Sequence, residues 1–177
     1  MEQMTKLRHE IDAHGNARVR VGILANRADR FDADGNKEGL NNPTIGLIHE
    51  FGSKGGSVPS GETGPGAQET VTTRAAVPAR SFLRMPLMTR LPDQLAQIGK
   101  DVWRSLVTTK GLLVALKELG VMGENIVQRA FETGGFGQWA PLSQFTIRKK
   151  GSSAILIDSG YLRKSITSAV IPGKAKQ

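Results

Sequence analysis

The sequence predicts an α+β fold, in which a small, mostly antiparallel sheet packs against two longer helices and one long loop projects from the body. Three patterns indicate this class. Residues 17–25 alternate polar and apolar side chains, which is typical of a strand with one buried face. Residues 91–132 repeat apolar side chains every three or four positions, as helices do. Between them, residues 53–77 are rich in Gly, Pro, Ser and Thr, as long connections are.

The length of 177 residues suits one domain. We expect an N-terminal segment at 1–17, a single domain at 18–171 with an extended arm at 53–77, and a flexible tail at 172–177. No apolar run approaches the ~20 residues that a membrane span needs, so we expect no contact with a membrane. The chain has no cysteine, which excludes disulfides and cysteine nucleophiles.

A short helix is predicted over 43–51, before the arm. Asn42-Pro43 is typical of an N-cap followed by the first helical residue, and Gly52 is a natural terminator. Glu50 should lie near the edge of this helix, because its apolar face is expected to combine Ile45, Ile48 and Phe51. In the arm itself, the β-branched residues of "ETVTTRAAV" favour one strand of an extended hairpin.

Two helices are predicted after the arm, one from about Pro92 to the interruption at Gly111 and one over 112–132. We expect them to pack together. Gly120 and Gly123 each cost a helix roughly 1 kcal/mol relative to Ala. Close approach of another backbone would explain them, and so would ordinary tolerance of glycine.

The last third contains shorter elements. The run "AILID" at 154–158 predicts a buried strand, and Asp158 or Ser159 is the expected N-cap of a short helix. Leu162 and Ile166 have the i,i+4 spacing of one helical face. The segment "ITSAVI" at 166–171 has the composition of a returning strand.

No constellation typical of catalysis is present. A zinc-protease motif that starts at His49-Glu50 would need a second histidine at position 53, which is Ser53. The stretch "GSKGG" lacks the Ser or Thr that follows lysine in a phosphate-binding loop, and no G-x-S-x-G elbow occurs. We therefore predict no catalytic residue, no cofactor and no metal. An enzyme remains the minority hypothesis, which a metal-dependent activity abolished by changing His49 or Glu50 would favour.

Arginine and aromatic residues form a set of possible anchors. "VPARSFLRMP" places Arg80 and Arg84 around Phe82, and "FGQWAPLS" contains Trp139. Arg and Trp dominate the energetics of many protein interfaces, so these side chains are candidates for subunit contacts. A role as core residues and a salt bridge is equally consistent with the pattern.

The formal net charge is +8, and the excess lies in two regions. Residues 53–90 hold five Lys or Arg against two acidic residues, and residues 139–177 hold seven against one. This basic surface is either a solvated face or a contact surface for nucleic acid or an acidic protein. The candidate contact residues are Arg148, Lys149, Lys150, Arg163 and Lys164.

Five motifs in register, "VRVGI", "LIHEFGS", "VPARSFLR", "WAPLSQFTIRKKGSS" and "ILIDSGYLRKSI", resemble the tail-completion or neck proteins of tailed bacteriophages, a group that includes Mu-like virion morphogenesis proteins. The resemblance covers about residues 18–168. It implies a non-enzymatic structural protein of the virion neck, at the head–tail connection, made in the host cytoplasm. The implied assembly is a homo-oligomeric ring, a hexamer or a dodecamer, around the DNA channel.

The same resemblance implies specific partners, namely portal or connector, tail terminator or tail tube proteins, with non-specific contact to genome DNA. The arm at 53–77 would reach a neighbouring subunit. The expected interface residues are Glu50, Phe51, Arg80, Phe82, Arg84 and Trp139. The alternative is a basic DNA-binding accessory protein that forms no ring.

Overall fold

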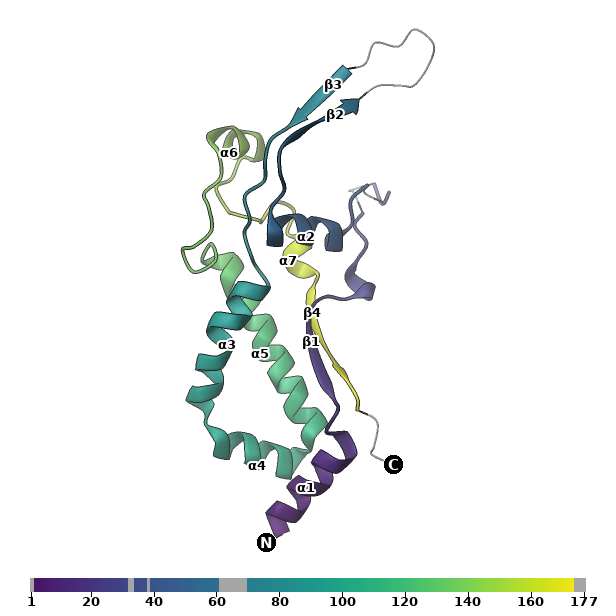
Figure 1. The fold of residues 1–177 in the computed structure, drawn as a ribbon, viewed down its shortest axis with the longest axis vertical. Coiled ribbons are helices and arrows are strands. Elements are labelled where there is room, and N and C mark those ends of the chain that lie inside the picture. Colours follow the sequence, from purple (N-terminus) through teal and green to yellow (C-terminus); the bar gives the residue numbers. More distant parts are fainter. Residues whose placement is uncertain (1, 32–33, 38, 61–69, 174–177) are drawn as a thin grey trace.

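The computed structural model describes residues 2–31, 34–37, 39–60 and 70–173. Its elements, in chain order, are α1 (Glu2–His14), β1 (Arg18–Ile23), η1 (Ala25–Arg27), α2 (Asn42–Phe51), β2 (Gly56–Ser60), β3 (Thr70–Arg74), α3 (Arg84–Ile98), α4 (Lys100–Lys110), α5 (Leu112–Glu132), α6 (Gln144–Lys150), α7 (Tyr161–Lys164) and β4 (Ile166–Ile171). A two-stranded antiparallel sheet, β1 and β4, packs against helices, and the predicted α+β class is confirmed (Figure 1). Within the described residues, no helix is long and apolar enough to span a membrane.

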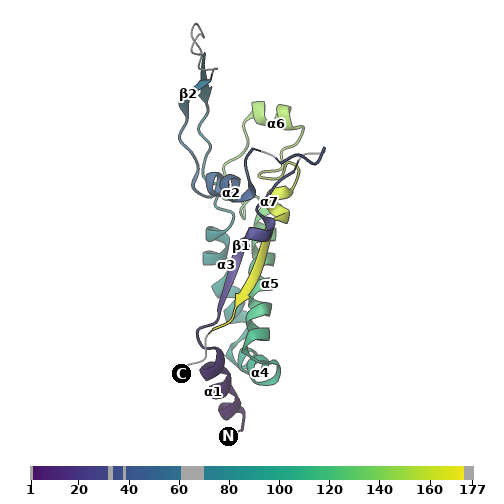
Figure 2. The same ribbon diagram turned by 90° about the vertical axis from the view of Figure 1, so that its right-hand side faces the viewer.

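The β1–β4 sheet lies along α5 (Figures 1 and 2). Its strands pair Val19 with Val170 and Val21 with Ser168, so these side chains share the face that meets the helix. A Cβ added at Gly120 would lie 2.9 Å from the Cβ of Ser168, and one added at Gly123 would lie 2.9 Å from Val21 Cγ2. Close approach to the sheet is therefore the reason for these two glycines.

The single helix predicted between Pro92 and Gly111 is wrong in its bounds. The chain is already helical from Arg84, and Gly99 (φ 80°) separates α3 from α4. This break turns α4 back toward α5, so that the three helices outline a triangle in Figure 1. Apolar spacing alone did not indicate the break, because an isolated glycine is often tolerated inside a helix. The expected packing of the longer helices against each other is confirmed, since both α3 and α4 contact α5.

The N-terminal segment folds as α1, which packs on α4. The Glu10 carboxylate accepts a hydrogen bond of 2.7 Å from the backbone N–H of Leu112, the first residue of α5. The first N–H groups of a helix have no acceptor within the helix, so α1 supplies one from outside.

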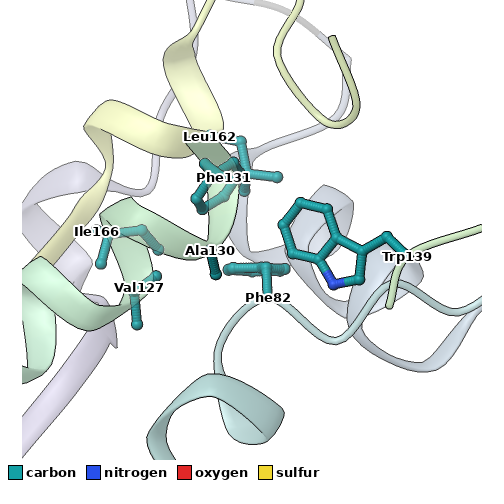
Figure 3. Packing of buried hydrophobic residues seen from close by; sticks show 7 residues of the cluster. All are labelled: Phe82, Val127, Ala130, Phe131, Trp139, Leu162 and Ile166. Atoms are coloured by element: carbon teal, nitrogen blue, oxygen red, sulfur yellow. The ribbon is translucent and has the colours of Figure 1, made fainter. Parts of the chain in front are cut away.

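The hydrophobic core joins α5 to Phe82, which follows the arm, to Trp139, to α7 and to the start of β4 (Figure 3). The centroid of the Phe131 ring lies 5.4 Å from that of the Phe82 ring and 5.8 Å from that of the Trp139 ring. The Phe131 and Trp139 rings meet edge to face. Such tilted pairs stabilise a core beyond the area that they bury. The buried cluster consists of Phe82, Val127, Ala130, Phe131, Trp139, Leu162 and Ile166.

The expected hairpin is present in the arm. Strands β2 and β3 pair antiparallel, from Gly56 with Arg74 to Ser60 with Thr70. The hairpin projects from the body at the end opposite α1 in both views (Figures 1 and 2). Positions 61–69 of the predicted arm and 174–177 of the predicted tail lie outside the described residues.

Three expectations for the last third are wrong. Residues 154–158 form a turn in place of a strand, with Leu156 at φ 59°. Their apolar side chains pack on the core without a partner strand, and a short apolar run does not reveal such a difference. Helix α7 begins after Gly160 with no side-chain cap from Asp158 or Ser159. Ile166 opens β4 and so does not share a helix with Leu162.

Helix α2 occurs as predicted, but its cap and its buried face differ. Asn41, not Asn42, is the N-cap, because its Oδ1 accepts a hydrogen bond of 2.9 Å from the N–H of Thr44. Asn42 is buried and donates from Nδ2 to the carbonyl of Arg27. Phe51 is 61% exposed and does not complete an apolar face, whereas Glu50, expected at the edge, is only 9% exposed.

Candidate functional site

The base of the arm is held by backbone contacts on both sides. Ser53 and Val77 exchange two hydrogen bonds of 2.9 and 3.0 Å, and the N–H of Arg80 donates to the carbonyl of His49 at 2.7 Å. Gly52 has a φ of 77°, and a Cβ there would lie 2.8 Å from the carbonyl oxygen of Val77. Only glycine combines this conformation with so close an approach. The two ends of the arm are thus fixed to each other and to α2.

Glu50 connects the end of α2 to the start of α3. Its carboxylate accepts hydrogen bonds from the backbone N–H groups of Phe82, Leu83 and Arg84, at 3.0, 3.0 and 3.1 Å. It also accepts one from the Ser81 hydroxyl, at 2.6 Å. A carboxylate at a helix N-terminus satisfies free N–H groups and interacts favourably with the helix dipole. The His-Glu pair therefore contributes a helix cap.

The segment "VPARSFLR", which follows the arm, contacts the segment "WAPLS" through side-chain hydrogen bonds in both directions. Trp139 Nε1 donates to the carbonyl of Ser81 at 3.1 Å. In the other direction, Arg80 donates from Nε to the carbonyl of Ala140 at 2.8 Å and from Nη2 to that of Pro141 at 3.0 Å. Segments about sixty residues apart in the sequence thus form one junction beside the base of the arm.

This geometry divides the six predicted interface residues into two groups. The side chains of four of them lie in the interior of the chain, as the core interpretation expected: Glu50, Arg80, Phe82 and Trp139. Phe51 and Arg84 are exposed, and the Arg84 guanidinium lies 5.7 Å from the Phe51 ring centroid. This cation–π pair is the accessible part of the predicted set, and it joins the end of α2, just before the arm, to the start of α3.

A pocket of about 580 Å³ lies between α2, α6, α7 and the turn that precedes α7. It brings Arg80, from the end of the arm, together with Lys149 and Lys150 of α6. Its charged lining consists of four cations, Arg30, Arg80, Lys149 and Lys150, and one carboxylate, Asp158. The pocket is therefore electropositive, and it contains two of the predicted basic contact residues.

His49 also lines this pocket, where its surroundings favour the neutral imidazole. Burial lowers its pKa below the ordinary value of 6.5, and the positive charges of Arg80 and Lys150 lower this pKa further. Its Nδ1 is buried without a hydrogen-bond partner. Burial also lowers the pKa of Arg80, although a guanidinium remains protonated in proteins.

The other predicted basic residues lie outside the pocket. Arg163 is bound to α5, because it donates to Gln128 Oε1 at 2.7 Å and pairs with Glu132. Arg148 and Lys164 are exposed on α6 and α7.

Three pocket residues, Arg30, Phe145 and Tyr161, were not identified from the sequence. Arg30 lies in a polar connection, and its guanidinium carbon is 5.4 Å from the Tyr161 ring centroid. No local pattern indicates that these side chains meet, since they are far apart in the chain.

No family model, curated protein or solved structure matches this chain.

Proposed function

We propose that this chain is a non-enzymatic structural protein of a tailed-bacteriophage virion, located in the neck at the head–tail connection. It assembles there as a homo-oligomeric ring, a hexamer or a dodecamer, around the DNA channel. Its partners are portal or connector, tail terminator or tail tube proteins. The support consists of the five sequence motifs and of one structural feature, the projecting arm.

The β2–β3 hairpin carries the proposal. A two-stranded hairpin is at best marginally stable by itself, and the outer edges of its strands present backbone N–H and C=O groups that can pair with another chain. This hairpin points away from the body in both views (Figures 1 and 2). The interactions fixing its base leave it directed outward. Contact with a second chain is the physical reason to keep such an arm.

A ring follows from how the arm is used. The arm of one subunit would meet a different surface on the next, and such a heterologous contact closes into a ring when its rotation divides a full turn. The net charge of +8 suits a subunit near a DNA channel, because basic residues attract phosphates without reading bases.

The second candidate is a DNA-binding accessory protein without a ring, which the exposed Arg148 and Lys149 favour. Such binding would weaken steeply with salt, because each neutralised phosphate releases counterions. A salt titration on duplex DNA measures this dependence.

The proposal is tested by the mass of the protein in solution, with and without the arm, by native mass spectrometry and light scattering over a wide concentration range. The shortened variant replaces residues 54–76 with Asn-Gly. Ser53 and Val77 already form a hydrogen-bonded antiparallel pair, so a two-residue turn closes them without strain. The body then keeps its own contacts.

We expect a hexamer or dodecamer for the full chain and smaller species for the shortened one. The control is Lys117→Ala, which changes an exposed residue of α5 and leaves the arm intact. Monomers of both chains at every concentration, together with salt-dependent DNA binding, would favour the accessory-protein alternative.

A further inference from the structure

The Arg80 side chain carries a positive charge that its two hydrogen bonds in the basic pocket do not neutralise. It is only 5% exposed, and its hydrogen bonds go to two backbone carbonyls, which are neutral. Among the described residues it forms no ion pair, and no hydrogen bond from its Nη1 is found. A buried charge without a counter-charge destabilises a fold, because it loses hydration without a compensating attraction.

We propose that this pocket binds a glutamate or aspartate side chain from an acidic segment of a partner protein, with the carboxylate on Arg80 and Lys149. The two carbonyls fix the plane of the Arg80 guanidinium before the ligand arrives. A guanidinium held in this way presents its remaining N–H groups without loss of rotamer freedom. Lys149 is exposed on α6 and supplies a second positive charge.

The pocket walls favour a peptide over duplex DNA. They are largely apolar, with contributions from Ile45, Leu142 and Phe145, and Phe145 is 70% exposed. An apolar neighbour of the acidic residue can cover this surface, whereas a sugar–phosphate backbone has little to bury there. Asp158 also faces the pocket and would repel a polyanion more than a single carboxylate.

His49 provides a spectroscopic signature of occupancy. The charged groups that line the pocket with it are the cations Arg30, Arg80, Lys149 and Lys150 and the carboxylate Asp158. A bound carboxylate opposes the effect of these cations, so occupancy should raise the pKa of His49. This shift separates binding in the pocket from attraction to the basic surface in general.

The inference deepens the proposed function, on which it rests for taking the partner to be a protein of the head–tail joint. The test uses the full-length chain, labelled with ¹⁵N, and a capped peptide of sequence Gly-Leu-Glu-Glu-Phe-Gly. A peptide with Gln in place of both Glu residues is the first control, and a short DNA duplex is the second probe. Affinity is measured by titration calorimetry, and the His49 pKa by nuclear magnetic resonance.

We expect the acidic peptide to bind, and the affinity of the Gln peptide to be lower by a factor of roughly ten or more. The pKa of His49 should rise only with the acidic peptide. Lys149→Glu should weaken binding roughly tenfold, whereas Lys117→Glu makes the same charge change on α5, outside the pocket, and should leave affinity unchanged. Because both lysines are exposed, neither change disturbs the core.

Any of three results would overturn the inference. The two peptides could bind with equal affinity, the two lysine variants could change the affinity equally, or the pKa of His49 could stay the same when the acidic peptide is added. Binding of the duplex alone would overturn it as well and support the accessory-protein alternative. The mass of the same samples distinguishes the two proposals. A chain that binds the acidic peptide but never forms a ring would refute the proposed assembly and leave the pocket inference standing.

Discussion

Replacing Glu50 with Ala should destabilise the protein by about 2–4 kcal/mol. The carboxylate serves three backbone N–H groups and one hydroxyl. The N–H of Phe82 is buried, and leaving such a donor without a partner costs about 1–3 kcal/mol. The other two N–H groups are partly accessible to water, so each adds less, about 0.5 kcal/mol. For a chain of this size, the melting temperature should fall by roughly 10 °C.

Thermal unfolding followed by circular dichroism measures this effect, with two comparisons. Ser81→Ala removes one hydrogen bond and should cost about 1 kcal/mol. Glu118→Ala changes an exposed carboxylate of α5 and should shift stability by less than about 0.5 kcal/mol. If Glu50→Ala melted at the same temperature as Glu118→Ala, the role of Glu50 as the cap of α3 would be refuted.

Three further changes test other contacts. Gly120→Ala should destabilise the fold by roughly 1 kcal/mol in urea unfolding, because crowding against Ser168 outweighs the gain in helix propensity; a more stable variant would contradict the close approach. His49→Gln should flatten the pH dependence of stability. The folded-state pKa of His49 lies below the unfolded value near 6.5, so the parent chain keeps its full stability above that value and loses stability as pH falls below it. Equal urea midpoints for variant and parent at each pH would count against this. Glu10→Ala should cost about 1 kcal/mol and speed amide hydrogen exchange in the first turn of α5, whereas unchanged exchange would show that α1 does not cap this helix.

Local patterns in the sequence were sufficient for much of the fold. The alternation at 17–25 predicted β1, the apolar spacing at 112–132 predicted α5, and the turn-rich segment at 53–77 predicted the arm. These elements depend on neighbours within a few positions, through side-chain periodicity and the backbone preferences of Gly and Pro. For that reason they are readable without knowledge of the contacts between distant segments.

The tertiary structure alone decided the features that involve distant segments. Glu50 is buried because the start of α3 brings free N–H groups to it, and the helix break at Gly99 occurs where α4 turns back to α5. Arg80, Lys149 and Arg30 line one pocket only after three separate segments have packed around the Phe82, Phe131 and Trp139 core. Periodicity in the sequence indicates which face of an element is apolar, but not which other element will cover that face. Which charged side chains line a pocket depends on which elements pack together, so the sequence alone did not predict the pocket.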